Sequence, residues 1–292
     1  MNAYLSGIGF SSVRTAEAIE ALIADVTSTY AGRTLFTSED GRPLVQYVKA
    51  FAKDCGLAVV GQVGSGGHFH AEYYRPYFRS HQVSLTEELS IEYLTDKDAY
   101  ACACEDPRLG FTLIFSLNNM AEFLLRLKDG HLRGGKRVVA LSGIALEGAV
   151  LLPVRENKKA EKIRRDAARE RKKLMDAARE GDEDAMESLS MEEVDTYSMI
   201  SKRLAREDIL TIVETSFMPC GVECDQYQIL GNIETCQYVR NAVTGEMLCQ
   251  MLITCNDIPL RVCINTRDLT GMPAAGCRFR GRIFLQGEVV FE

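Results

Sequence analysis

The chain has 292 residues, of which 46% are hydrophobic and 26% charged, and its formal net charge is −7. This is the composition of a globular protein whose core needs neither disulfides nor metals, and the length favours two domains. The acidic balance argues against general coating of nucleic acid, and without a signal-peptide pattern or the roughly 20-residue apolar run of a membrane span we expect a cytoplasmic protein without membrane contact.

The front of the chain, residues 1–154, predicts an α+β domain. Residues 15–28 have helical periodicity with Thr15 as N-cap, and residues 43–54 predict a second helix that ends before Gly56. Apolar and aromatic runs separated by turns then predict strands. The remaining expected elements are a glycine turn at 64–67, strands at 57–63, 68–78, 89–94, 111–117, 138–144 and 149–154, and a helix at 118–127.

A strongly charged segment follows. Basic side chains dominate its first part and acidic side chains its second, with a break near Gly181, where Asp182 is a candidate cap. We predict that residues 155–206 form a connector of exposed helices. Contact with nucleic acid, contact with a protein partner and formation of a homodimer through this segment are open alternatives.

The tail, residues 207–292, changes to strand periodicity from Gln226 onward. Alternating residues predict three strands, a break at 266–276 and two more strands. This is the order of a small oligonucleotide/oligosaccharide-binding (OB) barrel, and also of any five-stranded antiparallel meander. The predicted fold class is therefore α+β: a mixed or antiparallel sheet domain, a charged helical connector and an OB-like antiparallel barrel.

The ten cysteines of the chain do not suggest a disulfide scaffold. In a long chain without an export signal, cysteines behave as small buried hydrophobes. Cys249, Cys255 and Cys263 fit this reading, since each alternates with apolar residues. We interpret most of the cysteines as core thiols.

Two cysteines and two histidines give the sharpest metal hypothesis. His68 and His70 form one i, i+2 pair, and Cys102 and Cys104 form another. In strands each pair would point to one side, and two such pairs on neighbouring strands would offer four ligands to zinc. The alternative is a structural role, in which the histidines are polar residues at a sheet edge and the thiols pack in the core. Zinc is the one cofactor that the sequence suggests, and an enzyme with a zinc-dependent site is the alternative function.

Two further strands carry candidate interaction residues. The first would line an aromatic pocket with polar handles, or would pack its rings into the core; its residues are Glu72, Tyr73, Tyr74, Arg75 and Tyr77. In the second, alternation places Arg278, Arg280 and Arg282 on one face, which would bind an anion or nucleic acid, or would be a solvated face paired with acids.

Familiar catalytic signatures are missing from the sequence. The glycine-rich residues 61–68 lack the Lys-Ser/Thr that follows the last glycine of a phosphate loop, and no G-x-S-x-G or H-E-x-x-H motif occurs. The leading hypothesis is a non-catalytic binding or regulatory protein that contacts nucleic acid or another anion through the barrel.

Several segments together resemble a known family. They are EYYRPYF (72–78), GFTLIFSL (110–117), DTYSMISKR (195–203), FMPCGVECDQYQILG (217–231) and GCRFRGRIFLQG (276–287). They are similar to an uncharacterised family of about this length, found mainly in anaerobic Gram-positive bacteria. The resemblance covers nearly the whole chain and implies a full-length unit, but it brings no activity, cofactor or catalytic residue with it.

Overall fold

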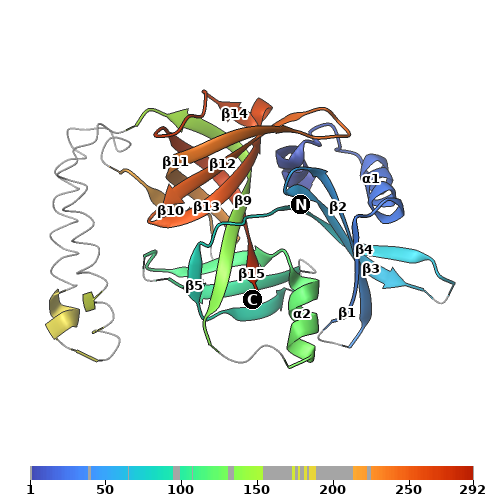
Figure 1. The fold of residues 1–292 in the computed structure, drawn as a ribbon, viewed down its shortest axis with the longest axis horizontal. Coiled ribbons are helices and arrows are strands. Elements are labelled where there is room, and N and C mark those ends of the chain that lie inside the picture. The colour runs from blue at the N-terminus through green and yellow to red at the C-terminus, as the bar shows by residue number, and fades with distance from the viewer. Residues whose placement is uncertain are drawn as a thin grey trace.

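The fold combines a four-stranded sheet with a much larger mixed sheet, and in the described part of the chain helices are few (Figure 1). The computed structural model describes residues 2–38, 41–64, 66–94, 99–106, 108–130, 135–153, 173–174, 177, 181–182, 184–188, 213–221 and 225–291. Among them, no helix has both the length and the apolar character that crossing a membrane requires.

The four-stranded sheet is antiparallel and keeps the order of its strands in the chain. These strands are β1 (Gly32–Thr37), β2 (Pro43–Ala52), β3 (Cys55–Val63) and β4 (Phe69–Phe78). One face of the sheet packs against α1 (Ala16–Ser28) and the short 3-10 helix η1 (Asn2–Ile8). The predicted N-cap is confirmed, because Thr15 Oγ1 accepts a hydrogen bond from the backbone N–H of Ala18 at 3.2 Å.

The helix predicted over residues 43–54 is wrong, since these residues form β2. β2 lies between β1 and β3, and its apolar side chains are used on both faces: Val45 and Tyr47 pack in one core and Leu44 in the other. A run of residues that is apolar on two sides fits the periodicity of a helix as well as that of a strand. These residues form a strand because their backbone pairs with two neighbouring strands. Asp54 lies in the turn after β2 and has a positive φ of 59°, and Gly56 is already part of β3.

The large sheet contains all the remaining strands. They are β5 (Leu85–Glu87), β6 (Ser90–Leu94), β7 (Ala99–Glu105), β8 (Thr112–Leu117), β9 (Arg137–Leu151), β10 (Ser216–Pro219), β11 (Gln226–Arg240), β12 (Met247–Cys255), β13 (Ile258–Asn265), β14 (Leu269–Thr270) and β15 (Arg278–Val290). The helices that accompany them are α2 (Met120–Lys128), close to the predicted 118–127, and η2 (Thr266–Asp268).

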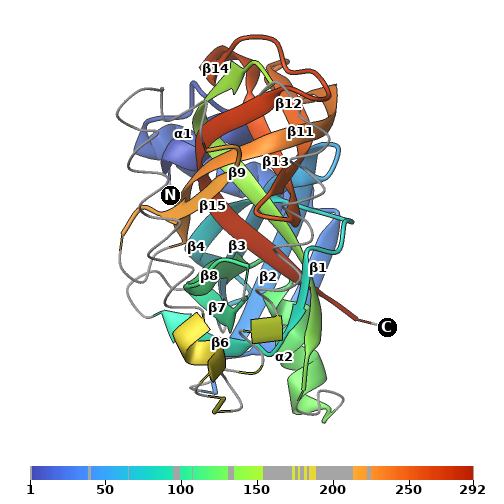
Figure 2. The same cartoon turned by 90° about the vertical axis from the view of Figure 1, so that its left-hand side faces the viewer.

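Five of these strands pair in a closed ring. β11 pairs with β12, β12 with β13, β13 with β9, β9 with β15, and β15 again with β11; the β13–β9 pair is parallel and the others are antiparallel. Figure 2 shows β9 and β15 running side by side as two long strands. The fifth strand of the ring therefore comes from residues 137–151 and not from the tail.

Two predictions at strand level change as a result. Two strands were expected at 138–144 and 149–154, and the single strand β9 covers residues 137–151. The last two expected strands of the tail are the single strand β15. Both are long because they pair with one another over 13 positions, through the ring and beyond it toward β8. The domain limits at residues 154 and 207 stay predictions.

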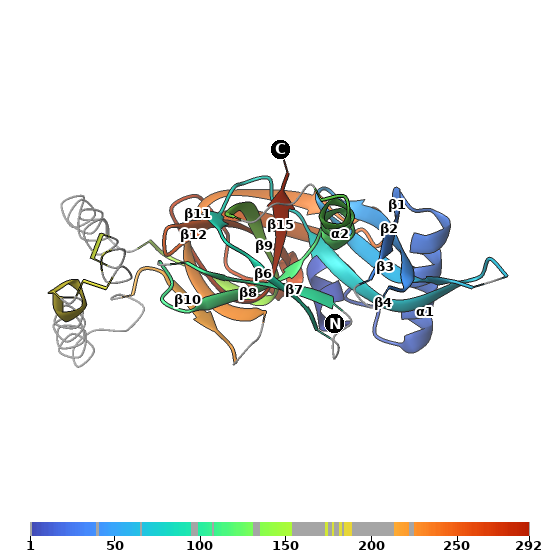
Figure 3. The ribbon, with the colours of Figure 1, turned by 90° about the horizontal axis from the view of Figure 1, so that it is seen from below.

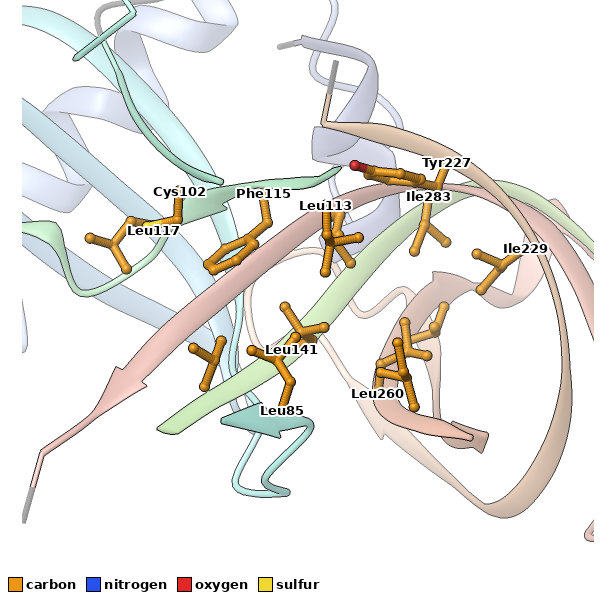
Figure 4. Close-up of a cluster of buried hydrophobic side chains, with 14 of the residues drawn as sticks. Leu85, Cys102, Leu113, Phe115, Leu117, Leu141, Tyr227, Ile229, Leu260 and Ile283 are labelled. Atoms are coloured by element: carbon orange, nitrogen blue, oxygen red, sulfur yellow. The ribbon is translucent and has the colours of Figure 1, made fainter. Parts of the chain in front are cut away.

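One apolar core runs from the ring into the layer formed by β5, β7 and β8. Figure 4 shows Ile229, Leu260 and Ile283 of the ring continuing into Leu113 and Phe115 of β8. A second core lies between the ring and the four-stranded sheet, around η1 and α1. Seen from below, the four-stranded sheet and the ring lie side by side (Figure 3).

Most of the predicted helical connector, residues 155–206, lies outside the described residues. In its described part residues 184–188 are helical, and Asp182 Oδ1 accepts a hydrogen bond from the backbone N–H of Ala185 at 3.1 Å. Asp182 is thus the cap that the sequence predicted.

Candidate functional site

The aromatic strand β4 lies between the two cores, and its rings take part in the packing of both. Tyr73 packs against one core and Tyr74 against the other, while Tyr77 is buried. Glu72 accepts hydrogen bonds from Arg42 and Gln62 near the sheet edge. The rings therefore have the packing role that the sequence offered as the alternative to a pocket.

Arg75 of β4 is a buried cation that ties the two sheets together. It is only 3% exposed, and it donates to Ser116 Oγ at 2.8 Å and to the carbonyl of Leu117 at 2.7 Å. Among the described residues its Nε has no hydrogen-bond partner, and burial lowers the pKa of the guanidinium. Neighbouring Gln286 donates to the carbonyl of Pro76 and accepts from the N–H of Phe78. We call Arg75, Ser116, Asn118, Ser142 and Gln286 the buried polar junction.

The structure does not gather the four predicted zinc ligands. Cys102 and Cys104 are buried in the core on β7, where Figure 4 shows Cys102 beside Leu117 and Phe115. His70 lies on β4 and is exposed, and His68 precedes that strand. Within the described part of the chain no group of three or more His, Cys, Asp or Glu is placed to hold a metal. Burial also raises the pKa of Cys104 to about 12, so it is a neutral thiol and not a thiolate.

The arginine strand is divided by the structure. Arg280 and Arg282 are exposed on the outside of the ring, and Arg282 donates to Gln226 Oε1. Arg278 is 5% exposed, and this burial lowers the pKa of its guanidinium. It donates hydrogen bonds to the carbonyls of Leu152 and Val213, so its role is to fix the backbone around it. Two of the three expected guanidinium groups are thus available at the surface.

A concave site that no sequence pattern suggested lies where the four-stranded sheet meets the outside of the ring. It has a volume of about 440 Å³. Its lining comes from the β2–β3 turn, from the segment after β4 and from three ring strands; the residues are Lys53, Asp54, His81, Gln82, Thr235, Cys236, Gln237, Gln250, Met251, Leu252 and Arg261. We call this site the polar pocket. Five separate segments of the chain form it, so no local sequence motif predicts it.

An ion-pair cluster forms the floor of the polar pocket. Arg261 Nη1 lies 2.8 Å from Asp54 Oδ2, and His81 Nε2 lies 3.1 Å from Asp54 Oδ1. Burial by itself would raise the pKa of Asp54, but the hydrogen bonds and charges of Arg261 and His81 outweigh it and hold this pKa below its usual value. Asp54 is therefore an ionised carboxylate.

The amide groups of the polar pocket are ordered by the same cluster. Gln250 Oε1 accepts from Arg261 Nη2 and from Gln237 Nε2, both at 3.0 Å, and Gln250 Nε2 donates to the carbonyl of Lys53 at 2.6 Å. Arg261 also lies over the ring of Phe78, 4.7 Å from its centroid. The floor is thus fixed, while the groups at the rim are solvent-exposed.

Comparison with known proteins gives a family match. A family model described as "Domain of unknown function, E. rectale Gene description (DUF3881)" matches residues 5–287. No curated protein and no solved structure matches the chain. The resemblance to an uncharacterised family of about this length is confirmed.

Proposed function

Since the chain belongs to the DUF3881 family, described as a domain of unknown function, we propose from its contacts that it is a non-catalytic binding protein whose ligand occupies the polar pocket. The observation that carries the proposal is the convergence of hydrogen-bonding side chains from both sheets on one concave surface. Binding sites for small molecules are hollows of roughly 300–1,000 Å³ with a few converging polar groups.

The chemistry of the polar pocket supports binding more than catalysis. The carboxylate in its lining is that of Asp54, whose lowered pKa makes it a weak base. The guanidinium of Arg261 is held by Asp54, by Gln250 and by the carbonyl of Arg79. Groups that are paired with one another orient a ligand by shape and charge but are poorly placed to exchange protons with it.

We further propose that the ring binds its ligand on the same strands as an OB barrel does. In OB barrels the outer face of the second and third strands binds ligands. In the ring described here β12 and β13 follow β11 in the same way, and Gln250 of β12 and Arg261 of β13 line the polar pocket. The proposal includes a cytoplasmic location, because buried thiols such as Cys249 and Cys255 are the form that a reducing compartment maintains.

Ligand-observed NMR with small polar probes tests the proposal. We would use inorganic phosphate, succinate, glucose 6-phosphate and glucose with the full chain and with Thr235→Trp, because Thr235 lines the polar pocket and is exposed. We expect at least one probe to bind the unchanged protein and to lose binding when the indole fills the pocket. A Met272→Trp variant, at a position that is 85% exposed and outside the polar pocket, serves as the surface control. Binding that is equal in all three proteins would contradict the proposal.

A second candidate function, nucleic-acid binding, is favoured by the exposure of Arg280 and Arg282 on one strand. Fluorescence anisotropy with single-stranded RNA and DNA tests it. Phosphate contacts predict affinity that falls steeply with salt and falls again in the Arg280→Ala, Arg282→Ala double variant. Salt-independent binding, or binding that is the same in the double variant, would exclude this surface.

A further inference from the structure

We infer that the ligand of the polar pocket is a small anion, carrying a phosphate or carboxylate group that is bound by Lys53. This inference rests on the proposed function and adds the chemical class of the ligand.

One positive charge in the lining of the polar pocket is not balanced. Asp54 is paired with Arg261, so these two charges cancel. Lys53 is exposed at the β2–β3 turn, and in the part of the chain that the structure describes its ammonium group takes part in no ion pair or hydrogen bond. The whole protein carries a net charge of −7, so a cationic hollow is a local exception that selects anions.

Asp54 would be expected to repel an anion, and its contacts remove that objection. Its two oxygens face Arg261 and His81, and its side chain is only 16% exposed. Arg261 in turn is 13% exposed and directs its donors to Asp54, Gln250 and the carbonyl of Arg79. This partly buried pair is therefore electrically neutral toward the pocket, and Lys53 sets the sign of the field there.

His81 adds a second contact for an anion. An ionised carboxylate only accepts hydrogen bonds, so the Nε2 of His81 that faces Asp54 carries a hydrogen. The other ring nitrogen, Nδ1, takes no part in this contact. The imidazole side chain is 73% exposed, so a ligand can reach it. In a doubly protonated ring both nitrogens are donors, so Nδ1–H would face an anion while Nε2–H stays with Asp54.

The rest of the polar pocket fits the uncharged part of such a ligand. Thr235, Gln82 and Gln237 offer a hydroxyl and two amides, which suit hydroxyl groups of a sugar or the carbonyl groups of an organic acid. No Phe or Tyr is among the residues that line it, so the stacking platform of a single-stranded nucleic acid is missing there. The volume of about 440 Å³ suits a compact metabolite.

Isothermal titration calorimetry tests the inference on the full chain with four probes: glucose 6-phosphate, inorganic phosphate, succinate and neutral glucose. The variants are Lys53→Gln, which removes the charge, and Lys53→Arg, which keeps it. We expect an anionic probe to bind more tightly than glucose, Lys53→Gln to weaken it by about 5–10-fold, and Lys53→Arg to retain most of the affinity. The phosphate and succinate arms decide which anionic group is preferred.

The outcomes separate the two proposals. Glucose binding as tightly as the anions, or anion binding that ignores Lys53→Gln, would overturn the inference; if Thr235→Trp still blocked that binding, the polar pocket would stand as a site for neutral ligands. Binding that survives Thr235→Trp would overturn the proposed function itself. Anion binding that depends on Lys53 and is blocked by Thr235→Trp supports both. Circular dichroism of every variant checks that it is folded.

Discussion

The buried polar junction and the polar pocket both join the four-stranded sheet to the large sheet, but only one of them is open to solvent. In the junction, Arg75, Gln286 and their partners are enclosed by protein. In the polar pocket, Asp54 and Arg261 make equally direct contacts across the sheets, yet Lys53 and His81 stay exposed beside them.

This difference separates a structural role from a binding role. Buried polar groups must find partners within the protein, and a network that does so fixes how two elements dock. A polar cluster at the surface needs no such completeness, because water satisfies what the protein leaves over, and a ligand can replace that water. Changes in the junction should therefore alter stability, and changes at the rim of the pocket should alter binding.

The largest expected effect is that of Gln286→Leu in the buried polar junction. The change leaves the carbonyl of Pro76 and the N–H of Phe78 buried without Gln286, so we expect a loss of about 3–4 kcal/mol in the free energy of unfolding. Urea denaturation measures it. A loss below about 1 kcal/mol would show that these groups find other partners and that the junction is not what docks the sheets.

Arg75→Met should cost less, about 2 kcal/mol. The variant deprives Ser116 and the carbonyl of Leu117 of a donor, but it also removes a buried charge that is expensive to desolvate, and methionine keeps most of the volume. Comparison with Arg75→Ala in the same denaturation assay isolates the packing part, since alanine adds a cavity. Equal losses for methionine and alanine would mean that charge and hydrogen bonding dominate.

Asp54→Asn tests the floor of the polar pocket, with an expected loss of about 1–2 kcal/mol at neutral pH. Asparagine tolerates the positive φ at this position, so the change removes mainly the charge. The folded-state pKa of Asp54 is below the unfolded value, so its stabilisation is present above about pH 4 and is lost as pH falls through the folded-state pKa. Stability curves of protein and variant should converge in acid; a constant gap would contradict the assignment.

The smallest effect on stability is expected for Lys53→Gln, below about 0.5 kcal/mol, because the side chain is exposed and its ammonium group contributes no described ion pair. Thermal denaturation without ligand measures it. The same variant should lower anion affinity, so stability and binding separate at this residue. A loss of stability as large as that of Asp54→Asn would make Lys53 part of the floor and not of the rim.

Sequence reasoning located most strands but not how they are joined. The cap at Thr15, the hairpin of β3 and β4 and the alternation in the tail were predicted correctly, because caps, glycine turns and period-two patterns are local signals. The polar pocket was not predicted. Lys53, His81 and Arg261 form no local motif in the sequence, and they come together only where five chain segments converge.

By itself, the sequence determined the family, the mostly apolar strands and the burial of cysteines such as Cys249, because composition and short-range periodicity carry that information. Only the tertiary structure decided that β2 is a strand and that β9 completes the ring, since backbone pairing with distant segments outweighs local preference. The tertiary structure also decided which cations are accessible to a ligand. Arg75 and Arg278 are buried among carbonyls and side chains, whereas Lys53 lines the polar pocket. Burial and pairing are long-range properties, and they make the same residue type structural in one place and available for binding in another.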